Sequence, residues 1–276
     1  MVLYNTVRVS SANVQGIRDK VKRVDILTYL LRDCHILCLQ DTHLTPSDIN
    51  SLTSQFPEYK ILINGVKTNS RGVAIILKNN FEFKIKHSEN DKNGNLILLD
   101  LQMGEISLRL IDVYAPNIDT PLFFSRIQEY FRNSTETYNL LCGDLNLVLD
   151  PKMDAFNYAN INNPKSRSVL LEAMKSLNLC DIYRDLYPDT KCYTWRRKNP
   201  VKQARLDYAI GTSSLLDIIN SCRIMPGYRS DHSRLDIELR MDSFIKGKGI
   251  WRFNCGLLKN VEYINNVKKW VNEVKQ

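Results

Sequence analysis

The 276-residue sequence predicts an α/β domain in which mixed β-sheets pack face to face between outer helices. Three observations support this fold class. Apolar segments typical of strands alternate with segments whose apolar residues recur at helical spacing. Hydrophobic residues make up 43% of the chain and charged residues 25%, which is ordinary for a globular protein. The length allows a substantial core, and the sequence shows no internal repeat, so one domain is expected. The two halves of this domain have a similar alternation of strands and helices.

The first elements alternate in this way. Residues 7–12 are expected to form a strand, residues 35–40 a second strand, and a helix should lie between them. One face of that helix carries the aliphatic residues Val24, Leu27, Leu30 and Leu31. A short helix should begin at Thr45 and Pro46, because threonine caps helix N-termini and proline suits the first helical position.

The later elements continue the alternation. Strands are expected near residues 59–63, 72–77, 81–87, 96–102, 106–114, 192–196, 205–210, 221–225 and 233–239. Helices are expected at 120–132, with Leu122, Ile127 and Tyr130 facing the core, and at 167–177. The domain should therefore span residues 1–240. Residues 241–276 should form a C-terminal extension, which either packs on the domain as a helix or begins a connector to a downstream region. The apolar residues of this expected helix are Leu257, Leu258, Val261, Ile264, Val267 and Trp270.

The composition limits the setting and the partners. Lys and Arg number 38 against 30 Asp and Glu, so the formal net charge of +8 mildly favours a polyanionic partner. No segment approaches about 18 consecutive apolar residues, and the N-terminus does not resemble a signal peptide, so no contact with a membrane is expected. The seven cysteines include no CxxC pair, and Cys38 and Cys142 lie in apolar segments typical of the core. An intracellular, reducing compartment is expected.

Polar residues follow several expected strands, where loops held by a rigid sheet usually carry catalytic groups. Gly143-Asp144-Leu145-Asn146 places a carboxylate and a carboxamide two residues apart, on one side of the chain. Aspartate can accept a proton from water, and asparagine can donate to a phosphate oxygen without adding negative charge, as phosphodiester hydrolysis requires. Alone, the tetrapeptide also fits an ordinary turn. Other strand ends carry Asn13, Asp41, Tyr114, Asp207, Asp231 and His232, and this joint order is hard to obtain by accident.

The ordered motifs resemble the endonuclease/exonuclease/phosphatase superfamily over about residues 5–240. They are Asn13, Asp41-Thr42-His43, Tyr114-Ala115-Pro116-Asn117, Gly143-Asp144-Leu145-Asn146, Tyr193-Thr194-Trp195, Arg205-Leu206-Asp207-Tyr208 and Ser230-Asp231-His232-Ser233. Within the superfamily the chain is most similar to the apurinic-endonuclease-like domain of non-LTR retrotransposon (long interspersed element) polyproteins. The resemblance implies a four-layer α/β sandwich, with two packed mixed β-sheets flanked by helices. It also implies phosphodiester cleavage with a divalent metal, usually Mg²⁺, with Mn²⁺ as the alternative.

The resemblance assigns the metal and the attacking water to four residues. Asp41 would be the acidic metal ligand, and Asn13 a second ligand or an orienting group. Asp144 would orient or deprotonate the water, and Asn146 would hold that water or a phosphate oxygen. The family usually has glutamate where Asp41 stands, and aspartate is shorter by roughly 1.5 Å. Since Mg²⁺ tolerates little displacement, it would bind here through a water, in a shifted position, or weakly.

The same resemblance assigns the substrate phosphate to a second group of residues. His232 would donate to the phosphate as charge builds on it, and Asp207 would fix the His232 tautomer and raise its pKa. Asp231 would assist at the metal or the water, and Tyr114 would donate to the phosphate or to the leaving oxygen. Thr194 would contact the substrate phosphate.

Basic residues gather beside aromatic ones between the last two motifs. Two expected strands flank residues 197–204, and Asn199-Pro200 favours a turn between them. In retrotransposon relatives a hairpin at this place probes the DNA groove. The expected DNA contacts are Thr194, Trp195, Arg196, Arg197, Lys198, Lys202 and Arg205. An earlier basic cluster, Arg18, Lys20, Lys22 and Arg23, fits either a solvated surface or a polyanion contact.

Three functions follow from these patterns. The first is a retrotransposon endonuclease that nicks one strand of duplex DNA in the nucleus and leaves a 3′-OH to prime reverse transcription, with the chain continuing into a reverse transcriptase. The second is an abasic-site repair enzyme or another superfamily phosphodiesterase. The third is a DNA-targeting module in which Asp41 has weakened the metal site.

Overall fold

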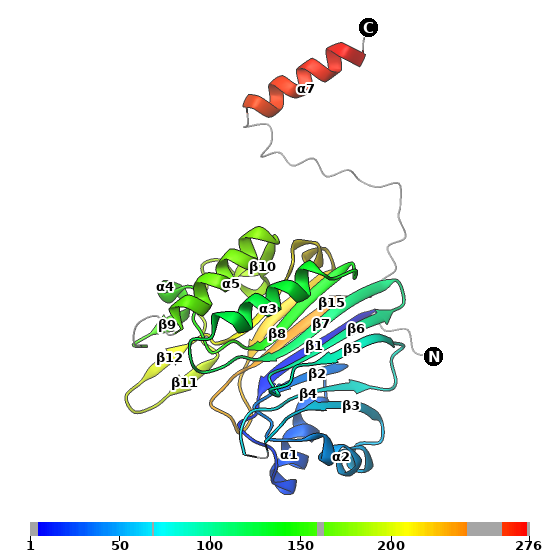
Figure 1. Ribbon diagram of the computed structural model, residues 1–276, viewed down its shortest axis with the longest axis vertical. Coiled ribbons are helices and arrows are strands. Elements are labelled where there is room, and N and C mark those ends of the chain that lie inside the picture. The colour runs from blue at the N-terminus through cyan, green and yellow to red at the C-terminus, as the bar shows by residue number, and fades with distance from the viewer. Residues whose placement is uncertain (1–4, 68, 159–162, 242–260, 275–276) are drawn as a thin grey trace. The chain divides into compact units, whose positions relative to one another are not determined.

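The computed structural model describes residues 5–67, 69–158, 163–241 and 261–274, and within these ranges it confirms the predicted α/β architecture. Two mixed β-sheets pack face to face, and helices cover the outer face of each (Figure 1). The layers are therefore helices, sheet, sheet and helices. The expected helix residues Leu257 and Leu258 lie outside the described ranges.

The first sheet consists of β1 (Thr6–Asn13), β2 (Ile36–Gln40), β3 (Tyr59–Asn64), β4 (Val73–Lys78), β14 (Ile219–Met225) and β15 (Arg234–Arg240). Within the described chain these strands lie in the order β14-β15-β1-β2-β4-β3. β1 runs parallel to β2 and antiparallel to β15. All five residues of β2 are buried, as expected of a central strand covered on both faces.

The second sheet consists of β5 (Lys84–Asn90), β6 (Leu96–Met103), β7 (Ile106–Tyr114), β8 (Tyr138–Asp144), β10 (Leu179–Asp181) and β13 (Asp207–Thr212). Their order in the described chain is β10-β13-β8-β7-β6-β5. β7 and β8 are parallel, and β13 returns antiparallel to β8. The core between the two sheets includes Cys38 and Cys142, which are fully buried as predicted.

Helices surround the two sheets. They are α1 (Lys20–Leu31), η1 (Pro46–Asp48), α2 (Ile49–Gln55), α3 (Pro121–Arg132), α4 (Pro151–Asp154), α5 (Pro164–Ser176), α6 (Ile182–Leu186) and η2 (Ser213–Ile218). α1 and α2 pack on the first sheet, and α3 and α5 pack on the second. No helix in the described ranges combines the length and the apolarity that crossing a membrane requires.

The buried face of α3 differs from the prediction. Ile127 is buried as expected, but Leu122 is 82% exposed and Tyr130 is only partly buried. The core contacts of the helix come from Phe124, Ile127 and Phe131. Because neighbouring positions on a helix are about 100° apart, Leu122 points away from this stripe.

The first basic cluster is partly committed to the fold. Lys22 Nζ donates to the backbone oxygens of Gln15 and Gly16 at 2.8 and 2.6 Å. Arg23 is buried and donates to the backbone oxygen of Arg18 at 3.1 Å. These contacts hold the loop after β1 against α1, so the two side chains stabilise this loop.

A small third sheet projects from the edge of the sandwich (Figure 1). It consists of β11 (Trp195–Arg197), β12 (Lys202–Ala204) and β9 (Ala155–Phe156), in the order β11-β12-β9 within the described chain. β11 and β12 form a hairpin at the predicted place, with its turn at residues 198–201. Its second strand lies within the loop expected at 197–204, and the strand expected at 205–210 is instead β13 of the second sheet. The sequence did not predict β9, because two residues are too few to show a strand pattern.

The contacts of the chain divide it into Met1–Asp242 and Ser243–Gln276. In the second unit the structure describes α7 (Val261–Val274), which contains the predicted helix residues Ile264, Val267 and Trp270. Trp270 is 61% exposed.

Candidate active site

The predicted polar residues meet at one edge of the two packed sheets. β1 and β2 run parallel, as do β7 and β8, so the residues at their carboxyl ends lie on this edge. β13 and β15 run antiparallel to β8 and β1, so their first residues return to it. In register, Asp207 lies opposite Asp144, which lies opposite Tyr114 on the other side.

A chain of buried side chains connects the two sheets at this edge. Asn13 donates through Nδ2 to Oδ2 of Asp144 at 2.9 Å. The same oxygen lies 3.9 Å from Nε2 of His232. On the other side of the imidazole, Nδ1 lies 2.8 Å from Oδ2 of Asp207. Asp207 therefore orients the ring so that Nε2 faces Asp144.

Burial and charge shift the pKa of two members of this chain. Burial, and then the charge of Asp207, raises the pKa of Asp144 to about 7. Burial alone would lower the pKa of His232, but the carboxylates of Asp207 and Asp144 outweigh it and raise that pKa to about 10. At neutral pH the His232 imidazolium can therefore donate a proton, and Asp144 can accept one.

Two residues fix the backbone that carries these groups. Gly143 has a φ of +137°, and a Cβ at this position would lie 2.0 Å from the backbone oxygen of Val113, so only glycine lets β8 pack against β7 here. Thr194 is fully buried, and its Oγ1 accepts hydrogen bonds at 3.0 Å from the N–H groups of Asp207 and of the residue before it. This corrects the predicted contact between Thr194 and a substrate phosphate, because the hydroxyl is committed to holding the start of β13.

Asn146 and Tyr114 both lie beside Asp144. The Asn146 N–H donates to Oδ1 of Asp144 at 2.9 Å, and its Nδ2 donates to the backbone oxygen of Ala115 at 2.8 Å. Burial, followed by the charges of Asp41 and Asp144, raises the pKa of Tyr114 well above its usual value, although hydrogen bonding with Asn146 opposes this rise. Tyr114 therefore keeps its phenolic proton and can donate it in a hydrogen bond.

Asp41 lines a cavity of about 380 Å³ together with Tyr114. Its backbone is left-handed, with a φ of +52°. Oδ1 of Asp41 accepts from the N–H of Arg71 and lies near Nε2 of His43, both at 3.2 Å. Oδ2 forms no hydrogen bond within the described chain, so it is available to a ligand.

The oxygen atoms at this edge fit a divalent metal such as Mg²⁺, which takes hard oxygen ligands and few protein carboxylates. Besides Asp41, Asn13 offers Oδ1, which accepts one backbone N–H at 3.1 Å and retains a lone pair. Oδ1 of Asp207 is buried without a hydrogen-bond partner in the described chain. Asp144, Asp207 and His232 also bring ligand atoms within 4.8 Å of one another. Because the imidazole between these carboxylates is already paired, Asp41 and Asn13 suit a hard cation better.

The β11–β12 hairpin is tied to the loop that carries His232. Trp195 donates through Nε1 to Oδ2 of Asp231 at 2.9 Å, and Arg196 donates to Oγ of Ser233 at 2.8 Å. A cavity of about 510 Å³ lies between the hairpin and this loop. The other predicted contacts of the hairpin are the exposed Arg197 and Lys198 and the partly buried Lys202.

Arg205 does not lie on the DNA-facing surface that the sequence predicts. Its side chain is 1% exposed, and its guanidinium donates to both carboxylate oxygens of Asp154 and of Asp181 at 2.5–2.9 Å. It also lies 4.4 Å from the centroid of the Tyr208 ring. The prediction that Arg205 contacts DNA is wrong, because its two acidic partners are 51 and 24 positions away and the local pattern does not reveal them.

Two residues near the site were not predicted. The Arg71 N–H fixes Asp41, and the Tyr158 ring packs edge-on against Trp195 with centroids 5.7 Å apart. Burial, followed by the charge of Asp144, raises the pKa of Tyr158. Both residues lie in loops, where a single sequence gives no periodic signal.

The match to the endonuclease/exonuclease/phosphatase family extends over residues 10–232 and includes the strand ends from Asn13 to His232. The chain belongs to this family. Two crystal structures confirm the family fold in this chain. The AP endonuclease LMAP of Leishmania major has a TM-score of 0.71 at 21% identity, with 86% of this chain and 88% of that chain covered. The APE2 catalytic domain of Xenopus laevis also has a TM-score of 0.71, at 19% identity, with 85% and 92% covered.

Relatives of known sequence include a transposon protein and two nucleases. The transposon TX1 uncharacterized 149 kDa protein of Xenopus laevis is 24% identical over 270 residues, and this alignment covers 94% of the present chain. The chain spans only 20% of that protein. The exodeoxyribonuclease of Bacillus subtilis is 27% identical, with 84% of this chain and 98% of that protein covered. The DNA repair nuclease APEX1 of Danio rerio is also 27% identical, with 84% and 82% covered. Within the family, the chain is thus similar in sequence to a DNA repair nuclease and in fold to an AP endonuclease.

Proposed function

We propose that this chain is a metal-dependent endonuclease that nicks one strand of duplex DNA by phosphodiester hydrolysis and leaves a 3′-OH to prime reverse transcription. The observation that carries the proposal is the buried connection from Asn13 through Asp144 and His232 to Asp207, which joins both sheets at one edge. Family membership supports phosphodiester chemistry. Similarity to a transposon protein over 94% of the chain supports the retrotransposon setting.

Each residue of the site has a proposed role in hydrolysis. Asp144 takes a proton from the attacking water, and Asn13 and Asn146 fix its two oxygens for this task. His232, held by Asp207, donates to the phosphate as negative charge develops on it.

The remaining roles concern the metal and the leaving group. A divalent metal held by Asp41 and Asn13 would neutralise charge on the phosphate when bound. Tyr114, which keeps its proton, donates to the phosphate or to the leaving oxygen. Asp231 lies 3.8 Å from Nε2 of His232 and supports the same water or metal.

DNA contact is proposed for the hairpin, and a longer protein for the chain as a whole. Trp195, Arg196, Arg197, Lys198 and Lys202 would contact the groove and the backbone next to the cut. Residues 1–240 would form the nuclease domain. Residues 241–276 would begin a connector towards a reverse transcriptase, and the enzyme would act in the nucleus.

Abasic-site repair is the second candidate function. The specific observation in its favour is the 27% identity to the DNA repair nuclease APEX1 of Danio rerio, with 82% of that protein covered. The basic hairpin supports cleavage of intact DNA instead, because it provides contacts that need no lesion.

One assay separates these functions. The chain and an Asp144→Ala control are incubated with Mg²⁺ and with supercoiled plasmid or with oligonucleotides that contain or lack an abasic site. Nicking of intact DNA that the control lacks, with ends that a polymerase extends, supports the retrotransposon endonuclease. Cleavage restricted to the abasic site supports repair. Salt-sensitive binding without any cleavage would leave only a DNA-targeting module.

A further inference from the structure

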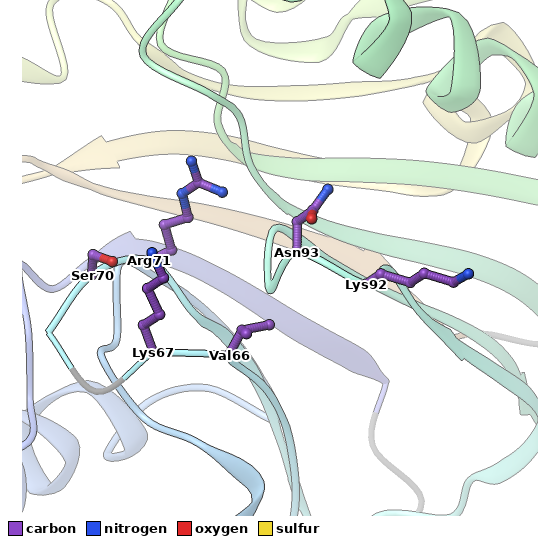
Figure 2. Close-up of a pocket in the computed structure, with 6 residues that line it drawn as sticks. All are labelled: Val66, Lys67, Ser70, Arg71, Lys92 and Asn93. Atoms are coloured by element: carbon purple, nitrogen blue, oxygen red, sulfur yellow. The ribbon is translucent and has the colours of Figure 1, made fainter.

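A second basic surface lies beside the cavity of Asp41 and Tyr114, away from the hairpin. A pocket of about 270 Å³ is lined by Val66, Lys67, Ser70, Arg71, Lys92 and Asn93 (Figure 2). Figure 2 shows Lys67 and Arg71 on one side of the pocket and Lys92 and Asn93 on the other. We propose that this pocket binds backbone phosphates of the DNA on the side of the cut opposite to the hairpin. The proposal rests on the function proposed above, since it names the substrate contact of the same site.

The charges of the pocket are not neutralised within the protein. The side chains of Lys67, Arg71 and Lys92 are exposed, and none of them forms an ion pair or hydrogen bond with the described chain. The acidic residue next to Lys92 is Asp91, which is buried. Its Oδ1 accepts from the N–H groups of Asn95 and Leu96 and from Asn64 Nδ2, at 2.7–2.9 Å. Three cations around one pocket repel each other, so an anion such as a phosphodiester would relieve this repulsion.

The two loops that form the pocket are rigidly joined, although they belong to different sheets. Lys67 and Arg71 lie between β3 and β4, and Lys92 lies between β5 and β6. The N–H of Gly72 donates to the backbone oxygen of Gly94 at 3.1 Å. A Cβ on Gly94 would lie 3.0 Å from Cα of Gly65, so the backbones touch. Binding to such a preorganised pocket loses little conformational entropy.

The position of the pocket relative to the cut follows from shared residues. Ser70 and Arg71 line both this pocket and the cavity that contains Asp41 and Tyr114. The hairpin instead shares its cavity with Asp231 and His232. A scissile phosphate between these two groups would have the pocket on one flank and the hairpin on the other. Figure 1 shows the hairpin projecting away from the β3–β4 end of the first sheet.

A double variant with a matched control tests the pocket. Lys67→Gln/Lys92→Gln removes two charges from it, and Lys60→Gln/Lys84→Gln removes two charges from exposed positions on β3 and β5 that do not line it. Binding to an intact duplex is measured in EDTA at several salt concentrations. Because each phosphate contact contributes about 0.9 to the slope of log K against log salt, the pocket variant should lose about 1.8 from that slope. The control should keep the wild-type slope. Equal slopes in the pocket variant and the wild type, or equal losses in both variants, would overturn the proposal.

A second measurement tests the side on which the pocket acts. Two duplexes are each shortened on one side of the nicking site, and Arg197→Gln/Lys198→Gln represents the hairpin. The pocket variant should lose affinity for one shortened duplex only, and the hairpin variant for the other only. Losses on the same duplex would overturn the two-sided arrangement. Failure of the wild type to nick DNA would reject the proposed endonuclease but not the pocket, because the salt dependence in EDTA requires no cleavage.

Discussion

Replacing Arg205 with alanine should destabilise the fold and not merely weaken DNA binding. The guanidinium is 1% exposed and donates to two carboxylates, those of Asp154 and Asp181. Removing it leaves these buried acids without their shared cation. Arg184 still donates to Asp154 at 2.7 Å, so one acid keeps part of its compensation. Breaking a buried ion pair by removal of one partner costs about 3–5 kcal/mol, and we expect a loss in this range.

Urea unfolding measures this loss. With an m-value of about 3 kcal/mol/M, the unfolding midpoint of Arg205→Ala should fall by roughly 1–1.7 M. Arg205→Lys should lie between this variant and the wild type, because lysine keeps the charge but cannot donate to both acids through a planar fork. The control is Arg197→Ala, at an exposed position of the hairpin, which should change the free energy of unfolding by less than about 0.5 kcal/mol.

Two results would refute this account of Arg205. One is an unfolding free energy of Arg205→Ala within about 1 kcal/mol of the Arg197→Ala value. The other is a fully folded Arg205→Ala protein whose only defect is a lower salt dependence of DNA binding. Either would restore the surface role that the sequence predicts.

Three further changes test the site. Gly143→Ala should cost about 1–3 kcal/mol in urea unfolding and lower plasmid nicking, because its Cβ would lie 2.0 Å from the Val113 oxygen; unchanged stability and activity would contradict this packing. His232 should stabilise the fold fully below its unfolded pKa of about 6.5, and this contribution should be lost as the pH rises through about 10. In EDTA, the free energy of unfolding should therefore fall between these two pH values in the wild type but not in His232→Gln. Asp41→Asn should raise the Mg²⁺ concentration for half-maximal nicking by about tenfold or more, and an unchanged Mg²⁺ dependence would remove Asp41 from the metal site.

The sequence predicts the strand ends of the site well because each depends on local signals. An apolar strand such as residues 138–142 ends in polar residues, and parallel pairing then brings such ends to one edge. The structure brings together Asp144, His232 and Asp207 there, as the motif order implies. The longer strands and helices were also predictable, since their patterns extend over several turns or pleats, whereas short elements such as β9 and β12 were not.

The rest could not be predicted because it depends on contacts between distant segments. Arg205 is basic in a basic segment, and only the fold reveals the acids that bury it. Thr194 similarly faces the backbone of β13 and not a substrate. The pocket of Lys67 and Lys92 is formed by loops of two different sheets, so neither loop predicts it alone. Local patterns thus specify which groups a strand end carries, and tertiary pairing decides which of them face solvent.

Asp41 shows how tertiary contacts change the meaning of one substitution. The sequence suggests a weakened metal site, because aspartate is shorter than glutamate by roughly 1.5 Å. In the structure, the N–H of Arg71 holds Oδ1 of Asp41, which restricts the carboxylate and leaves Oδ2 for a ligand. The side chain of Arg71 lines the basic pocket proposed to bind phosphate. One residue therefore connects the proposed metal ligand with the proposed DNA contact, so a phosphate bound in the pocket would hold Arg71 and, through its N–H, Asp41. Because the backbone of a rigid loop already fixes Oδ1, the shorter carboxylate can present Oδ2 to a metal from a defined position.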